Sequence, residues 1–94
     1  MDQRTSKLLL QSNRIGVSFL LTEIESADTF LDIADTTALP DSADRNRRHA
    51  FKAYMTVRQL LPRVVLEVEE EADINHKLDL IRQRLIEAGY SLDF

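Results

Sequence analysis

Cysteine is absent from the 94-residue sequence. A disulfide framework, a thiolate zinc site and a cysteine nucleophile are therefore excluded. Glycine and proline are scarce, with two residues of each, so few positions interrupt regular secondary structure. The stability of the chain must come from the packing of its apolar side chains.

Long apolar runs are also missing. The leucine run at positions 8–10 has three residues, whereas a membrane span needs about 20 apolar residues and a signal peptide has a longer apolar core. We therefore expect a cytoplasmic protein that does not enter a membrane.

The chain has no excess of positive charge, because 12 Lys and Arg face 16 Asp and Glu, for a net charge of −4. This balance argues against general phosphate binding over the whole surface. The length is that of one small domain, so we expect residues 1–94 to share a single core.

Strand periodicity is weak throughout. No window alternates apolar and polar residues over more than a few positions, and Val64-Val65-Leu66 is short and follows Pro62, so we assign it to a connection. We predict an all-α fold, a three-helix antiparallel bundle with a long first helix, completed by dimerisation. The helices are expected at about 5–35, 42–61 and 69–88, with a short tail at 89–94.

Turn-forming residues set these bounds. Pro40 is expected to close the first loop, and Asp41 or Ser42 to cap the second helix. Pro62 is expected to end that helix and Gly89 to end the third.

The first helix carries two lines of apolar residues at helical spacing. The main line, which should face the core, has steps of three and four and consists of Val17, Leu20, Ile24, Ala27, Leu31 and Ala34. A second line beside it consists of Leu8, Ile15, Phe19, Phe30 and Ile33. A helix with so wide an apolar arc needs neighbours on several sides.

The predicted lengths of the helices do not match. At 1.5 Å per residue the first helix is about 45 Å long and the others about 30 Å each, so its N-terminal part would remain uncovered in a monomer. We therefore expect a homodimer, with another protein as a possible partner. The residues predicted to mediate self-association are Leu8, Leu9, Leu10, Ile15 and Gly16.

Two further residues of the first helix have open interpretations. A glycine inside a helix costs about 1 kcal/mol relative to alanine, so Gly16 is either a tolerated weakness or the place where another helix approaches closely, which we favour. Asn13 lies on the main line. It either fixes the pairing register or marks the end of the buried region.

Charge is segregated by segment. The second helix is basic, and the end of the first helix and the start of the third are acidic. We expect neighbouring helices of opposite sign to pair, although each exposed pair contributes only about 0.2–1 kcal/mol.

The segment His49-Ala50-Phe51-Lys52-Ala53 resembles the His-x-x-Lys-Gly core of histidine phosphotransfer domains, which are helical bundles. The resemblance implies that His49 accepts a phosphoryl group and that Lys52 helps to hold its charge. Ala53 departs from the glycine of that family. The other interpretation is an exposed histidine on a basic helix.

Other sites are not expected. Asp73 and His76 are one helical turn apart, but helical metal sites draw such pairs from two helices, so we predict no metal and no other cofactor. A basic cluster at positions 45–49 is compatible with phosphate contacts, but the net charge argues against nucleic-acid binding. No catalytic constellation stands out, so we predict a non-enzymatic helical interaction or structural module.

Overall fold

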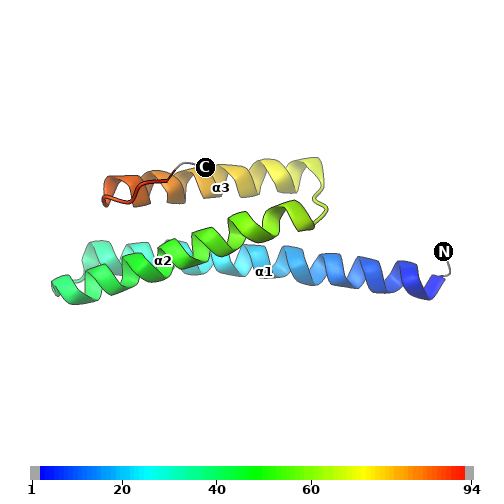
Figure 1. Ribbon diagram of the computed structural model, residues 1–94, viewed down its shortest axis with the longest axis horizontal. Helices are drawn as coiled ribbons and strands as arrows, with labels where there is room; N and C mark the ends of the chain where they lie inside the picture. Colours follow the sequence, from blue (N-terminus) through cyan, green and yellow to red (C-terminus); the bar gives the residue numbers. More distant parts are fainter. Residues whose placement is uncertain (1–2, 93–94) are drawn as a thin grey trace.

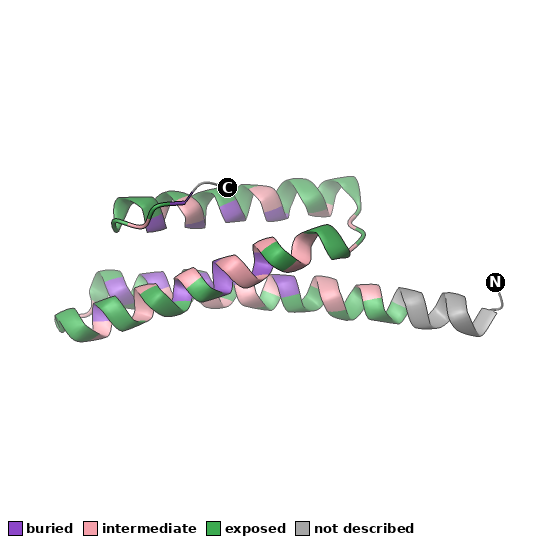
Figure 2. Cartoon of the chain, viewed as in Figure 1, coloured by how far each residue is buried: buried purple, intermediate pink, exposed green. Residues whose placement is uncertain are grey.

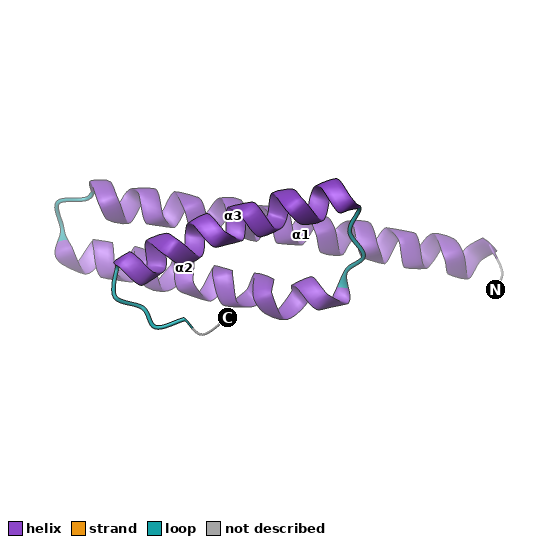
Figure 3. Ribbon diagram, turned by 90° about the horizontal axis from the view of Figure 1, so that it is seen from above, coloured by secondary structure: helices purple, strands orange, loops and turns teal. Residues whose placement is uncertain are grey.

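The computed structural model describes the backbone of residues 3–92 and the side chains of residues 11–92. It contains α1 (Gln3–Thr36), α2 (Pro40–Leu60), a short 3-10 helix η1 (Leu61–Arg63) and α3 (Val68–Glu87). Successive helices run antiparallel, and the described residues form no strand (Figures 1 and 3). The prediction of an all-α three-helix bundle is confirmed.

The start of α2 differs from the prediction. Pro40 is the first residue of the helix, after an extended Leu39 with φ −98° and ψ 114°, and no side chain caps the helix. Neither Asp41 nor Ser42 is the cap, because proline already has the φ angle of the first helical position and needs no backbone hydrogen bond there.

Both ends of α3 are held by hydrogen-bonded motifs. At its start the Glu67 side chain accepts from the backbone of Glu70, and the Glu70 side chain accepts from the backbone N–H of Glu67, which forms a capping box. At its end Gly89 has a φ of 101°. The N–H groups of Gly89 and Tyr90 donate to Ile86 and Leu85, as in a Schellman motif. Gly89 thus ends the helix as predicted.

The core lies where the three helices face one another (Figure 2). The main line of α1 is buried from Leu20 to Ala34, as predicted, and Val17 is half-buried. The side chains that α2 and α3 contribute are Ala50, Ala53, Tyr54, Val57, Ile74, Leu78, Ile81 and Leu85. The C-terminal segment completes this core, because Leu92 is buried and Tyr90 stacks on Phe51 with ring centroids 5.0 Å apart.

One arginine fastens α3 to the C-terminal part of α1. The Arg84 guanidinium lies 3.2 Å from a carboxylate oxygen of Asp28 and 2.9 Å from those of Asp32 and Asp35. Burial lowers the pKa of Arg84, but the hydrogen bonds that the guanidinium donates to the Asp35 and Asp32 carboxylates, and the charges of these carboxylates, outweigh it, so the pKa lies above its ordinary value. The acidic end of α1 is therefore paired with α3, whereas we expected pairing with the basic α2; α2 itself pairs with α3, because Arg58 lies 3.9 Å from Asp79.

Candidate interaction surface

The N-terminal part of α1 extends beyond the helices that cover the rest of it (Figure 1). The helix has 34 residues, which corresponds to about 51 Å, in a molecule whose longest dimension is 56 Å. The contacts of Asn13 and Gly16 with the α2–α3 connection mark where this cover ends. We call residues 3–12 the overhang.

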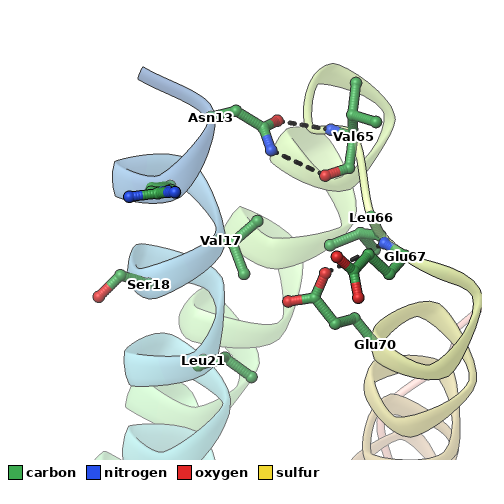
Figure 4. Close-up of a pocket in the computed structure, with 9 residues that line it drawn as sticks. Asn13, Val17, Ser18, Leu21, Val65, Leu66, Glu67 and Glu70 are labelled. Atoms are coloured by element: carbon green, nitrogen blue, oxygen red, sulfur yellow. Dashed lines mark hydrogen bonds between the residues drawn. The ribbon is translucent and has the colours of Figure 1, made fainter. Parts of the chain in front are cut away.

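Asn13 holds the α2–α3 connection against α1 (Figure 4). Its side-chain amide donates to the Val65 carbonyl oxygen over 2.8 Å, and its side-chain oxygen accepts from the Val65 N–H over 2.7 Å. Both backbone polar groups of an irregular segment are thereby satisfied by one side chain. Asn13 thus lies at the edge of the covered part of α1, and its role is to fix the connection.

Gly16 lies beneath the same connection. A Cβ atom added at Gly16 would come within 2.7 Å of Cγ1 of Val64. The close approach expected there is therefore present, but the neighbour is the connection after η1 and not another helix. Within one chain, the absence of a side chain at Gly16 allows Val64 to pack closely against α1.

Apolar side chains form an exposed line on the described part of α1. Ile15 is 71% exposed and Phe19 43% exposed. In steps of three or four residues, the line continues past the small polar side chains of Thr22 and Ser26 to Phe30 and Ile33. Phe30 is half-buried and Ile33 is exposed. We call the line Ile15, Phe19, Phe30 and Ile33 the outer stripe.

The predicted self-association residues occupy different places. Ile15 lies on the outer stripe, whereas the side chains of Leu8, Leu9 and Leu10 lie outside the described residues. The spacing of seven residues places position 8 on the same face of α1 as position 15. Phe19 was missing from the predicted set. Its four-residue step from Ile15 is the signal that identifies it.

A groove with a volume of about 550 Å³ opens on another side of α1, between this helix and the start of α3 (Figure 4). Val17 and Leu21 provide its apolar floor together with Leu66, and all three are half-buried. Its polar border includes Arg14, Glu67 and Glu70. Because Glu67 and Glu70 form the capping box of α3, much of the polar border already has a structural role.

The residues of the phosphotransfer resemblance lie on the exposed side of α2. His49 and Lys52 are both exposed. The His49 ring lies beside the ring of Phe30, with centroids 5.1 Å apart, so α2 borders the outer stripe at this point.

Asp73 and His76 lie on α3, where Asp73 pairs with Lys77 over 3.0 Å. Within residues 11–92, no group of three or more histidine or carboxylate side chains is placed to hold a metal ion. In the part of the chain that the structure describes, no helix has the length and apolarity to span a membrane.

Comparisons with known proteins give no further guidance, because no family model, no curated protein and no solved structure matches this chain. The chemistry of the exposed side chains is therefore the basis for a functional proposal.

Proposed function

We propose that this chain is a non-enzymatic helical interaction module that self-associates through the N-terminal half of α1. The observation that carries the proposal is the exposure of Ile15 and Phe19 on a helix whose core-facing line is buried only from Leu20 to Ala34. Burial of apolar surface contributes about 25 cal/mol per Å² of buried area. A complex in which a partner covers Ile15 and Phe19 is therefore stabilised. Position 8 of the overhang lies on the same helical face as Ile15.

A contrast with two exposed apolar residues elsewhere in the molecule supports this choice of surface. Leu39 and Leu80 are also exposed, but they lie on the first loop and on the middle of α3. Single exposed apolar residues are common on protein surfaces. Ile15 and Phe19, in contrast, share one helical face that continues into the overhang.

The proposal is tested by introducing charge on the outer stripe. We expect Ile15→Glu combined with Phe19→Glu to reduce the mass measured by light scattering to that of one chain while helicity by circular dichroism is retained, because exposed positions tolerate charge. The matched control is Leu39→Glu combined with Leu80→Glu, which adds the same charge elsewhere and should leave the mass unchanged. Equal masses for the two double variants would contradict the proposal.

The exposure of His49 favours a second candidate function, a phosphotransfer-like signalling helper. An exposed imidazole is accessible to a phosphorylated partner, and Lys52, one turn away, offers a positive charge. Incubation with a phosphorylated response regulator should then label the chain, and His49→Gln should abolish the label. Failure to label the unmodified chain would eliminate this candidate.

A further inference from the structure

The charges of α1 are divided between its two halves. Residues 3–22 contain Arg4, Lys7 and Arg14 and no acidic residue, whereas residues 23–36 contain five acidic residues and no basic one. Two copies of α1 packed in parallel would therefore place like charges together. Two antiparallel copies would place each basic half beside an acidic half.

The carboxylates nearest to the outer stripe are available for such pairing. Asp28, Asp32 and Asp35 bind Arg84, but Glu23 and Glu25 take part in no ion pair within the described residues. The same holds for Arg14 on the basic half. These charges, which pair with no other side chain of residues 11–92, lie on both sides of position 19 and have opposite signs.

A small hollow lies on the outer stripe next to these carboxylates. It has a volume of about 260 Å³ and is lined by Thr22, Glu25, Ser26, Thr29 and Phe30. The small side chains at positions 22 and 26 interrupt the apolar stripe there. An apolar side chain from another helix can fill such a depression in the surface of α1.

We propose, as a refinement that rests on the self-association proposed above, that the occupant of this hollow is the overhang of a second copy, with the two α1 helices antiparallel and the two-fold axis near Ile15. Paired residue numbers then sum to about 30. Leu8 of one copy faces Thr22 at the edge of the hollow, and Lys7 lies beside Glu25, which is on the same flank of the stripe and lines the hollow. Both overhangs are covered at once, because the contact is repeated by the symmetry.

Cysteine cross-linking tests the direction of the helices, and the chain has no cysteine of its own. Ile15→Cys alone should form a disulfide-linked dimer. Leu8→Cys and Thr22→Cys should each remain uncross-linked alone and form a dimer when mixed. Thr36→Cys, beyond the overlap, is the matched partner that should not cross-link with Leu8→Cys. A dimer of Leu8→Cys with itself would instead indicate parallel helices and overturn the proposal.

Charge exchange tests the register. Lys7→Glu and Glu25→Lys should each weaken the homodimer about tenfold at low salt, because each places two like-charged pairs at the interface. An equimolar mixture should associate as tightly as the unmodified chain, because both pairs in the mixed dimer then have opposite charges. If the mixture associates as weakly as the separate variants, the proposed register is wrong.

The outcomes separate this inference from the proposed function. A dimer that Ile15→Glu with Phe19→Glu disrupts, but that shows parallel cross-links or no charge rescue, overturns only the antiparallel arrangement. A chain that is monomeric at all concentrations overturns both the antiparallel arrangement and the proposed self-association. A monomer that sediments with phosphatidylserine vesicles, but not with phosphatidylcholine vesicles, would assign the overhang to an anionic membrane surface and would also overturn both.

Discussion

The two halves of α1 have the same secondary structure but different surroundings. From Leu20 to Ala34 the helix is covered by α2 and α3, and Arg84 binds three of its carboxylates. Before Asn13 no other described element covers it, and Ile15 and Phe19 project their side chains into solvent. Within one chain, α2, α3 and Arg84 therefore hold the C-terminal half, whereas the described contacts of the N-terminal half are those of Asn13, Gly16 and Val17 at its inner end.

The two halves should differ most in how much a carboxylate introduced into each of them reduces stability. Leu20 is fully buried, so Leu20→Asp places an unpaired charge in the core and should destabilise the chain by about 4 kcal/mol or more. Ile15→Asp makes the same kind of change five residues away on the exposed side. Circular dichroism with urea unfolding should show loss of folding only for Leu20→Asp. A folded, fully helical Leu20→Asp variant would contradict the placement of the core.

Asn13 lies at the boundary between the halves. Asn13→Ala removes two hydrogen bonds to Val65, each with a net contribution of about 0.5–1.5 kcal/mol. We expect the free energy of unfolding to fall by about 1–2 kcal/mol and the Val65 amide to exchange faster with solvent. Gln11→Ala, at an exposed position of the same helix, is the control. Slow exchange of Val65 in the Asn13→Ala variant would show that the connection is held by other contacts.

Replacing Arg84 should reduce the stability that α3 gives to the C-terminal half of α1. Because its ion pairs are exposed to solvent, Arg84→Gln should cost about 1 kcal/mol of unfolding free energy at low salt and less at high salt. Arg48→Gln, at an exposed position of α2, should have no such effect. If the unfolding free energies of both variants depended equally on salt, the ion pairs of Arg84 would not stabilise the packing of α3 on α1.

The pH dependence of this cluster has a definite sign. Because the pKa of Arg84 is raised on folding, its contribution to stability is fully present below the ordinary pKa and is lost only as the pH rises through the raised value. Titration of Arg84 should therefore leave stability unchanged across neutral and mildly alkaline pH.

The smallest effect is expected at Gly16. Alanine gains about 1 kcal/mol of helix propensity, but its Cβ would lie 2.7 Å from Val64, whose branched side chain has little freedom to move. Gly16→Ala should therefore bring no stabilisation in the unmodified chain and about 1 kcal/mol in the Val64→Ala background. A gain of the same size in both backgrounds would exclude the contact as the reason for the glycine.

Periodicity was sufficient to predict the helices and the core. Leu20, Ile24 and Leu31 are buried as their spacing indicates, because a continuous apolar line at helical spacing has few alternatives to burial. The loop before α2 was less predictable. Asp41 and Ser42 are good caps in isolation, but proline at the first helical position allows the helix to begin earlier.

Long-range partners were the part that local patterns could not predict. Nothing in the sequence near Asn13 identifies Val65 as its partner, since the two are brought together by the path of the connection after η1. The binding of Arg84 to three carboxylates of α1 depends likewise on the packing of α3. The candidate surface was predictable in its location, because the excess length of α1 follows from the spacing of loops and helices.

We propose that association with a second copy covers the exposed part of α1. The most direct measurement is the mass of the unmodified chain by sedimentation equilibrium over a wide range of concentrations. We predict a reversible transition from one chain of 10.8 kDa to two chains as the concentration rises. A mass that stays at one chain throughout would contradict the account.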